Sequence, residues 1–231
     1  MRSGDRQTRQ MLMKRLETNA GHRRGRASGF SLIEMTMVVA LTIVVSVVSV
    51  ISLVPLLKAQ HVTNAYNTTL TAMRQARDNA VSQRTSYEVS FVQNTTPPIV
   101  TTIQVIPTLA GGFTDEQNTV TYLFPNDVEF LLPPTGTPAP DSYGTGANMV
   151  DFGYTASSSA GGQTIIYFCP DGSAQTSSAC SGAGYWDGGV VYFGQSGNTG
   201  SYRAVDLWGG TGRVHGWRLY PAGTGYQWLR Q

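Results

Sequence analysis

The chain has 231 residues, enough for one membrane segment and one globular domain of ordinary size. Its formal charge of +2 conceals two regions of opposite sign, because the first 29 residues carry a net charge of +6 and leave −4 for the remainder. That balance argues against a general nucleic-acid-binding surface, which requires an excess of positive charge.

A long apolar run follows this basic leader. The 23 residues from Met35 to Leu57 contain no charge, and as a helix they would span about 35 Å, more than the roughly 30 Å of a bilayer core. The positive leader favours the cytoplasmic side of the membrane. The alternatives are an ordinary signal peptide, whose apolar region is shorter and precedes its cleavage site, and a simple uncleaved anchor.

The junction between leader and apolar run reads Gly29-Phe30-Ser31-Leu32-Ile33-Glu34. It resembles the prepilin-peptidase site of type IV pilins and type II secretion pseudopilins. The resemblance implies cleavage between Gly29 and Phe30, N-methylation of Phe30, and retention of the apolar helix. The family usually has a proline where this chain has Ile51, and the nearest proline is Pro55, so the place of a helix kink stays open.

Glu34 and the new amino terminus at Phe30 form the sharpest functional pair. A carboxylate near the membrane interior is costly unless it is paired. The resemblance favours pairing between Glu34 and the cationic amine on Phe30 of an adjacent subunit during assembly. The alternative is a carboxylate that stays hydrated among the lipid headgroups.

One helix is predicted from about Phe30 to Arg84. Beyond the apolar run, an amphipathic face with spacings of three and four comprises Val62, Tyr66, Leu70, Met73, Arg77 and Ala80. We expect this face to pack on a domain, with the stem of Arg77 at its margin. The opposite side, facing water or neighbouring subunits, comprises Asn64, Arg74, Gln75 and Asp78.

The rest of the chain is predicted to be β-rich, since 22 of the 26 glycines lie from Gly111 onward. Runs rich in Val, Ile, Tyr, Phe and Thr, bounded by turn residues, predict strands at Tyr87–Val92, Val100–Ile106, Thr119–Phe124, Val128–Leu132, Val150–Thr155, Thr164–Cys169, Gly189–Phe193, Tyr202–Trp208 and Val214–Tyr220. The predicted class is α+β, a long N-terminal helix on an antiparallel β-rich domain.

Loops at Pro133–Ala147 and Thr155–Gln163 are candidate contact surfaces. The predicted divisions are a leader (1–29), an assembly helix (30–57), its amphipathic continuation (58–86) and the globular domain (87–231).

A looser resemblance covers about the last 70 residues. The segments Ile166–Ala174, Tyr202–Leu207 and Gly212–Val214 resemble the late β-hairpins of the GspH/FimT group of minor pilins and pseudopilins. Pro170-Asp171-Gly172 by itself is simply a good turn.

Cys169 and Cys180 are the only cysteines, and no histidine cluster accompanies them. Their spacing suits a disulfide in an oxidising compartment better than a zinc site, and two reduced thiols are the alternative.

Arginines gather near the C-terminus at Arg203, Arg213 and Arg218, interleaved with tryptophans. Some FimT-like pilins bind DNA for uptake through a Gly-Arg-x-Arg motif here, and this chain has His215 in place of the second arginine. Arginines and aromatic rings are suited to phosphates and bases. The alternative, which we favour, is an ordinary hairpin with solvated arginines and core tryptophans.

No catalytic, cofactor or metal site is predicted. The chain lacks a nucleophile elbow and a phosphate-binding loop, and its histidines, His22, His61 and His215, lie far apart in sequence. A calcium site is the alternative to simple solvation for the acids Asp115, Glu116, Asp127 and Glu129.

The sequence therefore predicts a non-enzymatic minor pilin or pseudopilin that primes or caps a filament. The resemblance implies as partners other pilins or pseudopilins, a prepilin peptidase and an inner-membrane assembly platform. It also implies a single-pass inner-membrane precursor with a periplasmic domain, later part of a filament. A DNA-capturing pilin and a membrane-tethered enzyme are the alternatives.

Overall fold

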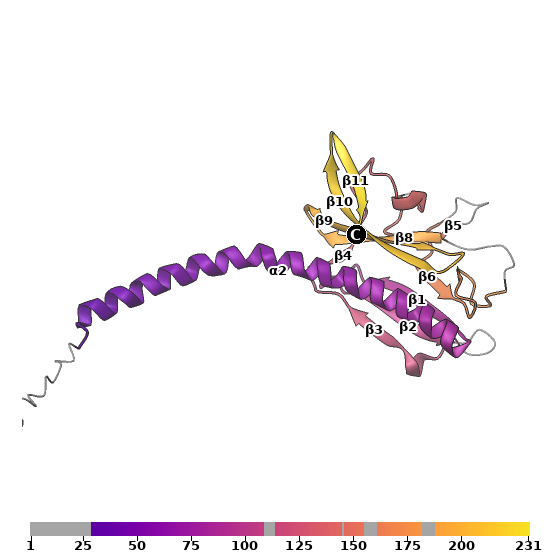
Figure 1. Cartoon of the computed structure of the whole chain (residues 1–231), viewed down its shortest axis with the longest axis horizontal. Coiled ribbons are helices and arrows are strands. Elements are labelled where there is room, and N and C mark those ends of the chain that lie inside the picture. Colours follow the sequence, from indigo (N-terminus) through magenta and orange to yellow (C-terminus); the bar gives the residue numbers. More distant parts are fainter. Residues whose placement is uncertain (1–28, 109–113, 145, 155–160, 182–187) are drawn as a thin grey trace, which may run out of the picture. The chain divides into compact units, whose positions relative to one another are not determined.

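The computed structural model describes residues 29–108, 114–144, 146–154, 161–181 and 188–231 (Figure 1). The predicted leader up to Ser28 and residues 155–160 of the second predicted loop lie outside the described residues. The chain divides into two compact units, Met1–Ile51 and Ser52–Gln231, and the β-sheets belong to the second.

A single helix, α2 (Leu32–Gln83), follows the predicted cleavage site. The predicted long helix is confirmed, with ends at most two residues from the expected ones. Pro55 lies inside this helix. Arg84 has a φ of 54°, the left-handed conformation that commonly ends a helix, and the chain then enters the first strand.

The amphipathic second half of α2 buries the face that its spacing predicted. The buried residues are Val62, Ala65, Tyr66, Thr69, Leu70, Ala72, Met73, Ala76 and Ala80. Alanines at four of these positions let the helix backbone approach its neighbours closely. Arg77 is half-buried at the margin, while Arg74 and Asp78 are exposed, as expected.

Two antiparallel sheets complete the fold, and the predicted α+β class is confirmed. The first has the order β3-β2-β1-β6-β7, with bounds β1 Ser86–Gln93, β2 Thr101–Thr108, β3 Val120–Leu123, β6 Ile165–Phe168 and β7 Ala174–Gln175. The second has the order β11-β10-β9-β8-β4, with β5 also paired to β8; its bounds are β4 Glu129–Phe130, β5 Val150–Tyr154, β8 Gly188–Gln195, β9 Asn198–Trp208, β10 Arg213–Ala222 and β11 Gly225–Arg230. Two short 3-10 helices, η1 (Glu116–Asn118) and η2 (Pro140–Ser142), lie in the connections.

Each of the nine predicted strands corresponds to an observed strand, although β4 is only two residues long. Two strands were not predicted. β7 is too short to leave a periodic pattern, whereas β11 has alternating Tyr226 and Trp228 and pairs with β10 across a turn at Gly223. That alternation was the available signal for β11.

The main core lies where the buried face of α2 meets apolar side chains from both sheets. A second cluster occupies the opposite face of the second sheet and contains Val190, Tyr192, Ala204, Leu219 and Trp228. β8 contributes alternate residues to both clusters, so every residue of this strand is buried. Burial on both faces explains its continuous apolar run.

The proline-rich connection between β4 and β5 covers the second cluster. The Trp228 indole donates a hydrogen bond of 2.8 Å from Nε1 to the carbonyl oxygen of Pro138, and the rings of Tyr143 and Trp208 lie 5.5 Å apart. The predicted contact loop thus also closes the outer face of the second sheet.

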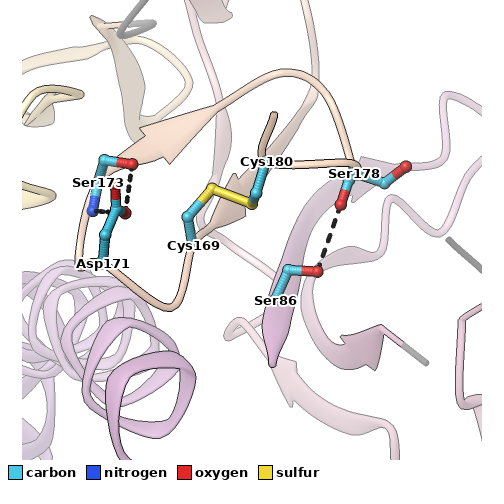
Figure 2. The surroundings of a disulfide bond; sticks show 6 residues. All are labelled: Ser86, Cys169, Asp171, Ser173, Ser178 and Cys180. Carbon is cyan, nitrogen blue, oxygen red and sulfur yellow. Dashed lines mark hydrogen bonds between the residues drawn. A yellow bond between two sulfur atoms is a disulfide. The ribbon is translucent and has the colours of Figure 1, made fainter. Parts of the chain in front are cut away.

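A disulfide joins Cys169, next to β6, to Cys180, with Cα atoms 5.7 Å apart (Figure 2). The turn after Cys169 is held by Asp171, whose carboxylate accepts hydrogen bonds from the backbone and the hydroxyl of Ser173. These bonds lower the pKa of Asp171. On the other side of the disulfide, the Ser86 hydroxyl donates to the Ser178 carbonyl oxygen.

Candidate functional site

The first half of α2 presents an uncovered apolar surface. Every residue from Gly29 to Gln60 is exposed, and the side chains include Leu32 at 82% and Ile51 at 67% exposure. The helix is long and apolar enough to cross a membrane. Water is a poor solvent for such a surface, at a cost of about 25 cal/mol per Å² of apolar area. Lipid or other apolar helices are suitable surroundings.

The polar side chains within this run bond back to their own helix. The Ser46 hydroxyl donates to the Thr42 carbonyl oxygen at 2.7 Å, and Ser49 donates to Val45 at 2.8 Å. Thr42 likewise donates to Val39. Because these hydroxyls are already hydrogen-bonded within the helix, the free-energy cost of placing them in an apolar medium is lower.

Glu34 lies in the first turn of α2, and Phe30 lies just before it. The backbone amides of Glu34 and Met35 both donate to the Ser31 carbonyl oxygen. The carboxylate therefore sits at the positive end of the helix dipole, which stabilises a negative charge there. Phe30 is 74% exposed.

A cluster of polar contacts joins the middle of α2 to the second sheet and to the residue that precedes β4 by two positions. His61 Nδ1 lies 2.8 Å from Asp127 Oδ1, and the Gln195 amide donates to both Asp127 Oδ2 and the Lys58 carbonyl oxygen. Asp127, one of the calcium candidates, is thus engaged by His61 and Gln195. Farther along α2, Arg77 Nε donates to the carbonyl oxygens of Thr211 and Gly172.

A basic hollow of about 650 Å³ opens beside Arg77. Its charged lining consists of Arg74 and Arg77 from α2, Arg213 and Arg230 from the ends of β10 and β11, and a single carboxylate, Asp78. His215 also lines it. Arginines from three separate elements thus converge on one surface, a suitable arrangement for binding an anion.

The three predicted DNA-binding arginines do not act together. Arg213 lines the hollow, but Arg203 is only 7% exposed and donates to the carbonyl oxygens of Ser201 and Tyr202. Burial lowers the pKa of Arg203 to about 10. Arg218 lies directly opposite Arg203 in the sheet, with its guanidinium over the Tyr220 ring. Side chains alternate between the two faces of β9, and Arg203 lies on the same face as the core residues Val205 and Leu207, so its side chain is mostly buried.

Three potential metal ligands meet on the second sheet. Asp141 of η2, Asp206 of β9 and His215 of β10 place one ligand atom each within 4.8 Å of the others, the one such group of three among the described residues. Burial raises the pKa of Asp206 to about 7 and lowers that of His215. Sequence reasoning missed this cluster because Asp141 is 65 residues from Asp206, and the β9–β10 register that pairs Asp206 with His215 is known only from the structure.

Comparisons of the chain with protein-family models, with curated proteins and with solved structures find no match.

Proposed function

We propose that this protein is a minor pilin or pseudopilin, made as a precursor and trimmed between Gly29 and Phe30. The observation that carries the proposal is the junction Gly29–Glu34 followed directly by one long, uncovered apolar helix. A folded unit with its own core follows on the same helix. This order matches a subunit that keeps its apolar helix after processing.

The apolar helix is the polymer interface in this proposal. Before assembly lipid surrounds it, and after extraction it packs against the helices of other subunits, because exposure to water is too costly. Small residues such as Ala40, Ser46 and Ser49 allow close helix contacts. The protein primes or caps a pilus or secretion pseudopilus, working with a prepilin peptidase and an inner-membrane platform.

The orientation of the precursor in the membrane follows from the positive charge of its leader. The basic leader stays on the cytoplasmic side, so that the precursor crosses the inner membrane once and its globular unit lies in the periplasm. An oxidising periplasm also suits the Cys169–Cys180 disulfide.

The mature amino terminus tests this proposal. Mass spectrometry of the protein purified from its native membrane is expected to show a chain that begins with N-methylated Phe30. A Gly29→Val variant is expected to remain uncleaved, because the peptidase site requires a small residue there. The matched substitution Gly25→Val, inside the leader, should leave cleavage unchanged. A native chain beginning beyond Leu57 would refute the proposal.

A second candidate function is capture of DNA, which the basic hollow favours. Arg74, Arg77, Arg213 and Arg230 surround one opening, so a phosphate there would meet several cations. The relevant surface differs from the C-terminal arginine group predicted from sequence, since two of its four arginines come from α2.

Binding of duplex DNA by the detergent-solubilised chain tests this second function. Arg213→Asn is expected to weaken binding at low salt and to reduce the slope of log affinity against log salt by about 0.9, the value for one lost phosphate contact. Arg84→Asn removes an equal charge outside the hollow, at a left-handed position that asparagine tolerates, and should change neither quantity. Absence of binding at low salt, or equal losses in both variants, would contradict DNA capture.

A further inference from the structure

The cluster of Asp141, Asp206 and His215 ties the loop between β4 and β5 to the second sheet. Asp206 and His215 are direct cross-strand partners on β9 and β10, and Asp141 reaches them from η2. His215 Nδ1 lies 3.6 Å from Asp141 Oδ2 and 3.6 Å from Asp206 Oδ1. Both separations are too long for a hydrogen bond.

Asp206 is buried with little compensation. Its side chain is 1% exposed, and neither carboxylate oxygen has a hydrogen-bond partner of good geometry, although the Trp217 indole and the Asp141 carboxyl lie beside it. His215 Nε2 is also buried and without a partner. A buried carboxylate is costly unless an opposite charge or hydrogen bonds compensate it.

His215 Nδ1 is far enough from each of the two carboxylate oxygens for an ion to lie between them, and all three ligand atoms lie within 4.8 Å of one another. Consider an ion about 2.1 Å from His215 Nδ1 and from each carboxylate oxygen. The angle at the ion between His215 Nδ1 and either oxygen would then be about 118°, because each pair of ligand atoms is 3.6 Å apart. That angle is close to tetrahedral. One imidazole nitrogen with two carboxylates is a ligand set that suits zinc, and it leaves a position for water.

We propose that Asp141, Asp206 and His215 form a binding site for a divalent transition metal, with zinc the best fit. The ion compensates the buried Asp206 carboxylate and fastens η2 to β9 and β10. Its role is structural, because it holds the loop that covers Tyr192 and Trp228 on the outer face of the sheet. The site is independent of helix processing, and it shares His215 with the lining of the basic hollow.

Zinc binding to the full-length chain in detergent tests the site. After removal of metal with a chelator, titration with Zn²⁺ against a colorimetric competitor is expected to show one site per chain. Asp141→Asn and His215→Gln should each weaken that site at least about a hundredfold, more than the roughly 10–100-fold cost of losing an outer-shell partner. Asp141 is exposed, so its variant is expected to fold, which circular dichroism checks.

His61→Gln is the matched control, since His61 also faces an aspartate but belongs to no group of three ligands among the residues that the structure describes. It should keep the zinc affinity of the unmodified chain. Failure of the unmodified chain to bind zinc stoichiometrically would overturn the proposal and leave a proton shared between the carboxyl groups. Equal affinity in the Asp141→Asn and His215→Gln variants would overturn it as well.

Discussion

Replacing Glu34 by valine is expected to reduce incorporation into filaments at least about a hundredfold, while cleavage after Gly29 continues. In the proposed assembly the Glu34 carboxylate pairs with the amine on Phe30 of a neighbouring subunit. Removing one partner leaves the other charge unpaired in an apolar setting, at a cost of about 3–5 kcal/mol, and each 1.4 kcal/mol is tenfold in an equilibrium. The measurement is the fraction of the protein in sheared or cross-linked filaments.

Thr36→Val is the matched control for this prediction. Thr36 lies two residues from Glu34, and its hydroxyl donates to the Ile33 carbonyl oxygen within the same helix. Its loss removes a polar group without removing a charge, so assembly should continue. Normal assembly of the Glu34→Val protein would show instead that the carboxylate is merely hydrated among headgroups.

Gly189→Ala is expected to lower the free energy of unfolding of the globular unit by about 3 kcal/mol or more. A Cβ atom at Gly189 would lie 2.5 Å from both the carbonyl oxygen of Asp151 and the Cα atom of Phe152. These are backbone atoms of the paired strand β5, so no side-chain rotation relieves the clash, and the strands must separate. Overpacking of this kind typically costs 1–3 kcal/mol and sometimes more.

Guanidinium unfolding of the detergent-solubilised chain, followed by tryptophan fluorescence, measures this effect. Gly225→Ala is the matched control, because a Cβ atom there has no neighbour within 4 Å and Gly225 also lies in a strand of the same sheet. We expect its free energy of unfolding to change by less than about 1 kcal/mol. Similar losses in the two variants would show that the close approach of β5 and β8 is not the cause.

Features that depend on neighbouring residues in the chain could be read from the sequence. The absence of charge from Met35 to Leu57 and the recurrence of apolar residues from Val62 to Ala80 gave the helix and its buried face. Alternating or continuous β-branched and aromatic runs located nine strands. Periodicity is a local property, because helix and strand each impose a fixed repeat on the side chains.

The candidate sites depended on contacts between distant segments. Arg213 and Arg230 meet Arg74 and Arg77 only because β10 and β11 end beside α2, whereas the neighbouring Arg203 is turned inward by strand alternation. The loop between β4 and β5 was predicted as a candidate contact surface, and its packing on Trp228, which covers the outer sheet face, was not predicted.

The sequence by itself determined the long helix, its apolar and amphipathic halves and the β-rich remainder, since each depends on consecutive residues. Tertiary structure alone decided which strands share a sheet and which charged groups meet. Asp141, Asp206 and His215 show the reason: strand register and loop packing bring them within ligand distance, and no local pattern encodes either.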